Sequence, residues 1–437
     1  MTASGPPRVG GPSRLRRLAL DLTPLRASRD FRLVWFGLLI TSTGSQFTLV
    51  AVFIQVKQLT HSTAAVGATG LAYLAGLIVG SLAGGAILDA WDRRRLLMTA
   101  QLGLAAGSAI LLGGAIAGRP PLWVVYAGLA VLAANSAIDG PTRSAMTPRL
   151  VGSSLVPAAQ ALNQVVWNAA ALFGPAVAGV VIAAAGVTVA YAIDLTSIAC
   201  MFVAASLLRP MPPSKGERGA AGLLAIKEGF DFARRHRLIM STFVIDLIAM
   251  IFGLPRALFP FLIVQQFHRS QASVGLLFSA PAVGALIGAL TSGWAGRIRR
   301  QGIAVILSVT AWGAAIAAFG WSQNWLWFGL AMLAVAGWAD VISAIFRSTI
   351  LQLSAPDRLR GRVSGIHILV VTGGPRLGDV EAGVVARLVS PTFSVVSGGL
   401  ACIAGAALVA LAYPELRRAR AGELSLDYAP PHGEAGG

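Results

Sequence analysis

The sequence predicts an all-α polytopic membrane protein whose twelve transmembrane helices form two six-helix bundles. The first observation is composition, because the 437 residues are 55% hydrophobic and 12% charged, whereas a soluble domain carries roughly 25% charged residues. The second is length: the apolar stretches run for about 20 residues, as a helix across a ~30 Å hydrocarbon core requires, and they lack the alternation of barrel strands. The third is an internal repeat.

The expected parts follow in order along the chain. They are a basic leader (1–30), an N-terminal bundle (31–208), a linker (209–237), a C-terminal bundle (238–412) and a polar tail (413–437). We place the spans at 31–56, 64–88, 96–117, 122–142, 158–184, 187–208, 238–264, 272–294, 303–320, 324–346, 363–387 and 391–412. In the linker, apolar residues recur at helical spacing at Leu223, Ile226, Phe230 and Ala233. This pattern indicates an amphipathic helix along the membrane surface, or a plain tether.

Positive charge is concentrated in alternate connections on this map. Arginines follow the second, fourth, sixth, eighth and tenth spans, at Arg93–Arg95, Arg143 and Arg149, 209–237, Arg297–Arg300, and Arg347–Arg362. By the positive-inside rule these connections and both termini are cytoplasmic in a multi-pass cell-membrane protein. The net charge of +17 is thereby explained without a nucleic-acid partner.

The repeat joins the two halves. At a shift of about 208 positions, four glycines fall on four others: Gly67, Gly76, Gly80 and Gly85 on Gly275, Gly284, Gly288 and Gly293. A second match, at a shift of about 200, sets the helix-bending pair Gly174–Pro175 against Gly374–Pro375. A third sets Arg143 against Arg347. A duplicated helix bundle is the architecture of a carrier that rocks one half against the other.

Residues 85–97 (GAILDAWDRRRLL) resemble the signature loop of the major facilitator superfamily, through Gly85, Asp89, Arg93 and Arg94. Ala90 and Asp92 depart from that pattern. THSTAAVG (60–67), RALFPFL (256–262) and PDRLRGRVSG (356–365) resemble the enterobactin-exporter-like branch. The resemblance implies that Asp89 latches the halves together on the cytoplasmic side, with Arg143 or Arg362 as its partner, or with the N-terminus of the eleventh helix. The alternative is a solvated surface acid.

Charges inside spans are functional candidates because they are expensive in lipid. Asp246 and Asp340 lie about 10–12 Å from the cytoplasmic ends of their helices, on helices that line the cavity in the resembling family. We expect them to exchange protons. The alternative is that each acid is satisfied in a helix contact.

The eleventh span carries a second charged cluster of Arg376, Asp379 and Glu381. Arg376 and Asp379 share a helix face, and Arg256 lies level with Glu381. We expect Arg256 to bridge to Asp379 or Glu381, to close the extracellular side, and to open it when the acid takes up a proton, which makes Asp379 and Glu381 further proton-coupling candidates. A static structural pair is the alternative. Asp194, in the sixth span, is read as structural.

The N-terminal half is expected to offer neutral polar and aromatic groups to a cargo. The candidate cavity residues are Gln46, Tyr73, Asn135, Asn163, Trp167 and Asn168, together with Trp338 from the C-terminal half. Each aromatic has the alternative of an ordinary packing role.

The sequence therefore predicts a monomeric, proton-driven exporter of a small amphiphilic molecule, either a siderophore or a drug-like compound. An importer, or a non-transporting sensor or scaffold, remains the alternative. No nucleophile–base set, phosphate loop or metal-ligand spacing is present in the sequence, so we expect no enzyme, no metal and no cofactor, with the proton gradient as the energy source.

Overall fold

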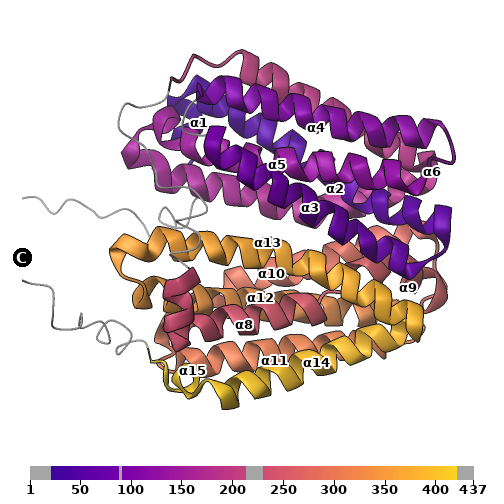
Figure 1. The fold of residues 1–437 in the computed structure, drawn as a ribbon, viewed down its shortest axis with the longest axis vertical. Helices are drawn as coiled ribbons and strands as arrows, with labels where there is room; N and C mark the ends of the chain where they lie inside the picture. Colours follow the sequence, from indigo (N-terminus) through magenta and orange to yellow (C-terminus); the bar gives the residue numbers. More distant parts are fainter. Residues whose placement is uncertain (1–20, 88–90, 213–229, 421–437) are drawn as a thin grey trace, which may run out of the picture.

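The computed structural model describes residues 21–87, 91–212 and 230–420. Every regular element in these ranges is a helix, and the helices form two groups that lie one above the other in Figure 1. The first group holds α1 (Thr23–Ala27), α2 (Arg29–Thr60), α3 (Thr63–Ile87), α4 (Arg93–Ile116), α5 (Leu122–Val151), η1 (Ser153–Leu155) and α6 (Val156–Ser206). The second holds α8 (Arg237–Phe252), η2 (Arg256–Leu258), α9 (Phe259–Gln265), η3 (Gln271–Ser273), α10 (Val274–Thr291), η4 (Ser292–Arg297), α11 (Gln301–Gly320), α12 (Leu326–Ser354), α13 (Asp357–Leu388), α14 (Pro391–Ala412) and α15 (Pro414–Arg418).

The described helices account for the twelve expected crossings. Ten segments are long and apolar enough to span a bilayer, and one of them contains α6. Gly186 interrupts α6 with φ 80° and ψ 173°, a backbone conformation that glycine adopts without strain, so α6 crosses twice. The remaining crossing is α13, whose charged residues keep it out of the apolar set.

Several helices are longer than the predicted spans. The extension matters most in α5, which reaches Val151, and in α12, which reaches Ser354, beyond the expected ends at 142 and 346. Arg143 and Arg347 therefore lie inside helices and not in the connections between helices. Of the linker pattern, Leu223 and Ile226 lie outside the described residues, whereas residues 230–235 are helical.

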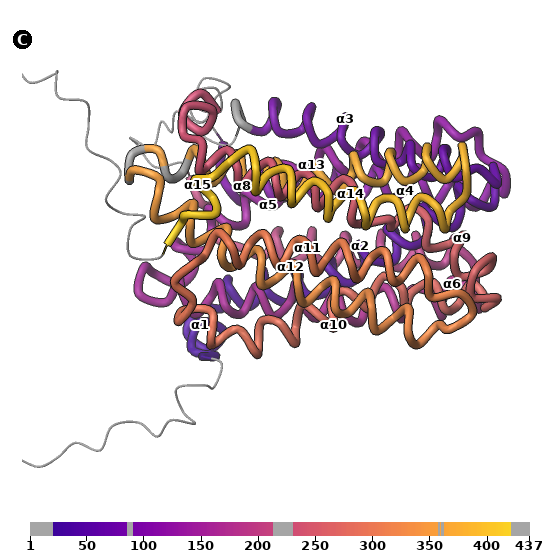
Figure 2. The backbone as a smooth tube through the Cα atoms, turned by 90° about the horizontal axis from the view of Figure 1, so that it is seen from below, coloured from indigo at the N-terminus to yellow at the C-terminus, as the bar shows by residue number. Residues whose placement is uncertain are grey.

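The short helices α1 and α15 lie at the same end of the molecule in both views (Figures 1 and 2). We call this the termini end and the opposite one the far end. The N-terminus of α2 and the C-terminus of α14 are at the termini end, and the α2–α3 connection is at the far end.

The glycine repeat is a repeat of helix contacts. Gly76 of α3 packs on the backbone of Ala130 in α5, and Gly284 of α10 packs on the backbone of Ala334 in α12. A Cβ at either glycine would overlap its neighbour's carbonyl, so small residues are what allow these helices to approach closely. The two halves thus use matched glycines for the same internal contact.

Matched glycines also join the two bundles. Gly67 of α3 meets Asp379 and Gly383 of α13, and Gly275 of α10 meets Pro175 and Gly179 of α6. These contacts lie toward the far end, where the Thr63 hydroxyl donates to the carbonyl of Gly383 at 2.9 Å and Lys57 donates to that of Pro260. The bundles therefore close against each other at the far end.

The contacts of the two Gly-Pro motifs can be compared directly. Gly174 packs on the Cβ of Gln46 in α2, and Gly374 packs on the Cβ of Met250 in α8, so the two motif glycines make the same kind of contact with the first helix of their own half. The contacts between the bundles differ. The carbonyl that Gly275 meets belongs to Pro175, whereas the carbonyl that Gly67 meets belongs to Asp379. At this contact the second half has an acid where the first half has a proline.

Candidate functional site

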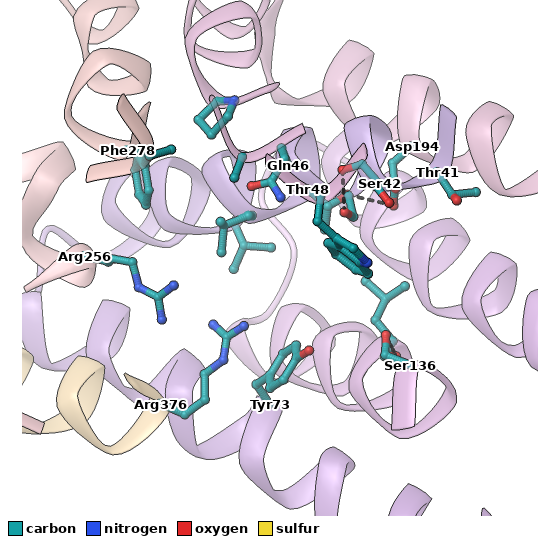
Figure 3. Close-up of a pocket in the computed structure, with 18 of the residues that line it drawn as sticks. Thr41, Ser42, Gln46, Thr48, Tyr73, Ser136, Asp194, Arg256, Phe278 and Arg376 are labelled. Carbon is teal, nitrogen blue, oxygen red and sulfur yellow. Dashed lines mark hydrogen bonds between the residues drawn. The ribbon is translucent and has the colours of Figure 1, made fainter. Parts of the chain in front are cut away.

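A cavity of about 630 Å³ lies between the two bundles. Its size is within the range of about 300–1,000 Å³ for small-molecule sites. Residues from α2–α6 and from α10, α12, α13 and the η2 region line it. Figure 3 shows Arg256, Arg376 and Tyr73 directed into one part of this space, with Gln46, Thr48 and Asp194 in another. Both groups of helices therefore contribute polar side chains to one chamber.

Four of the seven predicted cavity residues line this space: Gln46, Tyr73, Trp167 and Asn168. The other three lie outside the lining. Asn135 donates to the carbonyl of Val131 on its own helix and packs beside Gly103 of α4. Trp338 donates to the Thr291 hydroxyl at 3.4 Å, and Asn163 is half-buried in α6. Each of the three was predicted from its residue type alone. Residue type does not show which side of a helix faces the cavity.

The first charged cluster of the second bundle is organised around Arg347. Its guanidinium lies 2.9 Å from an Asp246 oxygen and 3.6 Å from an Asp340 oxygen. His367 of α13 approaches Asp246 at 3.9 Å. The side chains of Arg347 and Asp246 are 3% and 0% exposed, whereas Asp340 is 34% exposed and lines the cavity. The cluster thus connects the cavity surface to a buried acid.

Arg347 and His367 are members of this site that were not predicted from the sequence. The usable signal for Arg347 was its position seven residues after Asp340, which places both on one face of α12. Ending the predicted span at 346 removed that signal. For His367 we find no comparable pattern, since it joins the cluster through the packing of α13 on α8.

The first bundle carries an acid that the prediction missed. Asp139 of α5 is buried, lines the cavity and forms an ion pair with Arg143 one turn later. Gln101 of α4 donates to its other oxygen at 2.8 Å. The expectation that this half offers only neutral groups was therefore wrong. Asp139 lies in the expected span 122–142, so its position in the sequence was sufficient to find it.

The predicted latch cannot be located because Asp89 lies outside the described residues. Of its proposed partners, Arg143 is paired with Asp139, and Arg362 is half-buried in α13. Arg94 donates to the carbonyl of Ser206, and Arg93 is buried at the start of α4. These arginines lie toward the termini end of the first bundle and of α13.

The second charged cluster forms around Asp379, which is fully buried. Arg256 lies 4.0 Å from the Asp379 carboxylate and Arg376 lies 3.7 Å from it. The guanidinium of Arg376 also lies 3.7 Å from the centre of the Tyr73 ring, which belongs to the other bundle. Of the two acids offered as partners of Arg256, the structure places Asp379 beside it. Glu381 is half-buried, and its electrostatic neighbour is the Cys402 thiol of α14.

Asp194 lies where the first bundle's own helices meet. One of its oxygens accepts from the Thr48 hydroxyl at 2.8 Å and from the Ser108 hydroxyl at 3.0 Å. These donors come from α2 and α4, so the acid joins three helices. This arrangement agrees with the structural role expected for Asp194.

We expect Asp194→Ala to lower the thermal stability of the purified protein, because both hydroxyls lose their buried acceptor. Each unsatisfied group costs about 1–3 kcal/mol. Asp194→Asn keeps one acceptor oxygen and should destabilise less. Thermal unfolding in detergent measures both, and equal melting temperatures for the two variants and the wild type would contradict the structural role.

Two helix bundles around a central cavity that carries charged side chains are the arrangement found in transporters of the major facilitator superfamily. Solved structures of this superfamily share the fold. The nucleoside transporter NupG matches with a TM-score of 0.67 at 14% identity, covering 89% of this chain and 99% of that one. A bacterial homologue of the iron transporter ferroportin in an inward-facing state matches with a TM-score of 0.67 at 14% identity, covering 89% and 98%.

A model of the transmembrane secretion effector family matches residues 19–431, and the chain belongs to this family. Among its relatives is the enterobactin exporter EntS of Citrobacter koseri, 29% identical over 410 residues, which span 92% of this chain and 96% of the relative. The enterobactin exporter EntS of Escherichia coli O157:H7 is 28% identical over 404 residues, with the same coverage. The superfamily and the enterobactin-exporter-like branch predicted from the sequence are confirmed.

Proposed function

We propose that this protein is a secondary active exporter of a small amphiphilic molecule, working by proton antiport and alternating access. The observation that carries the proposal is the cavity lined by both bundles, with glycine-mediated contacts closing the bundles against each other at the far end. With the termini in the cytoplasm, this is a state that receives cargo from inside the cell. The enterobactin exporters among the relatives favour export, and a siderophore or a drug-like compound, over import.

Protons are proposed to act at the Arg347 cluster. Asp340 reaches the cavity and shares Arg347 with the buried Asp246. When Asp340 takes up a proton, its pairing with Arg347 weakens and the guanidinium is left to Asp246 alone. Occupancy of the cluster by protons thus changes the ion pairs between α8 and α12. Asp379 is the second candidate, because its neutralisation would release two arginines near the closed far end.

The test is transport in proteoliposomes under an imposed pH gradient, with enterobactin and ethidium as separate probes. We expect outward movement of at least one probe against proton entry. Asp246→Asn and Asp340→Asn, made separately, should each abolish the dependence on the gradient. Glu415→Gln is the matched control, since Glu415 pairs with Arg237 at the exposed termini end.

Three results would overturn the proposal or a part of it. Normal gradient-driven transport by both variants between pH 6 and 8 would remove the coupling assignment. Uptake in the reverse orientation only would make the protein an importer, and no flux of either probe, with the protein folded, would favour the sensor or scaffold alternative.

A further inference from the structure

The closed part of the cavity contains more positive than negative charge. Arg256 and Arg376 both line the cavity, and a single carboxylate, that of Asp379, lies within ion-pair distance of them. Neutralising both guanidiniums requires a second negative charge. The other acids lining the cavity among the described residues are engaged elsewhere: Asp139 with Arg143, Asp340 with Arg347, and Asp194 with two hydroxyls.

The pairing with Asp379 is also loose. The distances of 3.7 and 4.0 Å exceed the about 2.7–2.9 Å of a charge-assisted hydrogen bond. The buried Nε of Arg256 has no hydrogen-bond partner among the described residues. Guanidinium N–H groups therefore remain available, and buried donors of this kind are costly unless they bind an acceptor.

The two arginines are positioned as a binding site and not as solvated surface charges. Their side chains are 22% and 16% exposed, and Figure 3 shows both guanidiniums directed into the same space. The Arg376 guanidinium lies over the Tyr73 ring, with 3.7 Å between its Cζ and the ring centre. A guanidinium placed over an aromatic face keeps its edge N–H groups for a planar, bidentate acceptor. Arg256 comes from a different element, so two separate segments converge.

Aromatic side chains line the cavity beside this charge. Phe278 stacks on Phe53 with ring centres 5.8 Å apart and meets Phe259 edge-to-face at 5.0 Å. All three border the cavity, as does Arg256. Phe53 and Phe259 are 2% and 0% exposed and Phe278 is 8% exposed, so Phe278 is the ring that a cargo would contact, with the other two supporting it. A planar apolar group next to an anion would thus find both kinds of partner within one chamber.

We propose that Arg256 and Arg376 form a subsite for the anionic group of an aromatic cargo, a carboxylate or a phenolate, with Tyr73 holding Arg376 in place. The subsite names the substrate class of the exporter proposed above and rests on that function for its role in transport. Tyr73 and Arg376 belong to different bundles. A cargo bound here therefore contacts the interface between the bundles, which opens during the proposed transport cycle.

The test is equilibrium binding to the full-length protein in detergent, without any gradient. Three naphthalene probes of matched size differ in charge: naphthalene-2-carboxylate, naphthalene-2-methanol and 2-naphthylmethylamine. We expect the carboxylate to bind about 10- to 100-fold more tightly than the alcohol, as for hydrogen bonds to a charged group, and the amine to bind most weakly. Raising the salt concentration should weaken the binding of the carboxylate probe and leave the affinity of the other two probes unchanged.

Variants separate recognition from folding. Arg376→Gln should remove most of the preference for the carboxylate and leave alcohol binding unchanged, and Arg376→Lys should keep part of it. Arg237→Gln is the matched control, because Arg237 also lies over a tyrosine ring and beside an acid, at the exposed termini end. Melting temperatures identify any variant that has failed to fold, and Arg256→Gln then provides a second test of the same preference.

Equal affinity for the three probes, or equal losses for all three in a folded Arg376→Gln protein, would overturn the subsite. The two proposals fail separately. Gradient-driven export of ethidium without anion preference would remove the subsite alone. Anion-selective binding without flux of any probe would retain the subsite and remove the transport function.

Discussion

Arg347→Leu is expected to destabilise the protein strongly and to abolish pH-driven transport. Arg347 is the buried cation that lies between Asp246 and Asp340, so its removal leaves two acids without their partner on the same helix contact. Breaking a buried ion pair from one side costs about 3–5 kcal/mol. Thermal unfolding in detergent and flux in proteoliposomes measure the two effects.

A double-mutant cycle identifies the cause. Arg347→Leu combined with Asp246→Asn removes both members of the 2.9 Å pair, and we expect the combined variant to be more stable than Arg347→Leu alone, because no uncompensated charge remains there. The surface pair of Arg237 and Glu415 is the control, where the same cycle should stay within about 1 kcal/mol. Simple addition of the two effects at Arg347 would show that the pair is not coupled.

Gly67→Leu and Gly275→Leu are expected to prevent closure of the far end and to reduce transport at least about tenfold. Gly67 touches the backbone of Asp379, and Gly275 touches that of Pro175. A leucine at either position requires the bundles to separate, because packed interiors do not absorb an added side chain. Accessibility of a cysteine introduced at Thr63 to a membrane-impermeant thiol reagent reports the opening, and flux reports the loss of cycling.

Gly113→Leu is the matched control for these changes. Gly113 lies near the end of α4 with open space around it and is exposed, so a leucine there should leave both accessibility and transport unchanged. Because the two contacts are equivalent in the two halves, Gly67→Leu and Gly275→Leu should have similar effects. Normal transport by both would show that the far-end contact is not part of the cycle.

The crossings and the two-bundle fold could be predicted because lipid imposes length and hydrophobicity on every helix. The spans at 158–184 and 187–208 were separated correctly although α6 is nearly continuous, since Gly186 was left between them. Helix ends were harder to predict. α12 continues past a charged residue because Arg347 is neutralised inside the bundle. Hydropathy alone does not detect an ion-pair partner that lies on another helix.

The site was predictable where charge stood alone in an apolar segment. Asp246, Asp340, Asp379, Arg256 and Arg376 all belong to buried or cavity-lining clusters. Two of their partnerships were predicted: Arg376 with Asp379, which share a helix face, and Arg256 with Asp379, which lie at a similar depth. The partnership of Arg347 with Asp246 and Asp340 was not. The Gly-Pro match between the halves was visible in the sequence. The presence of Asp379 in one bundle contact and Pro175 in the other depends on how α3 packs on α13 and α10 on α6, which the sequence does not show.

The matched contacts of Gly67 and Gly275 are two copies of one isologous interface, as in a twofold homodimer, but carried on a single polypeptide. In a true dimer any substitution would appear twice. Fusion of the halves removes that constraint, so the position occupied by Pro175 on one side could become Asp379 on the other. The chain can thus combine a rigid, uncharged contact with an ionisable one across the same axis. Two identical subunits would have the same residue at both contacts.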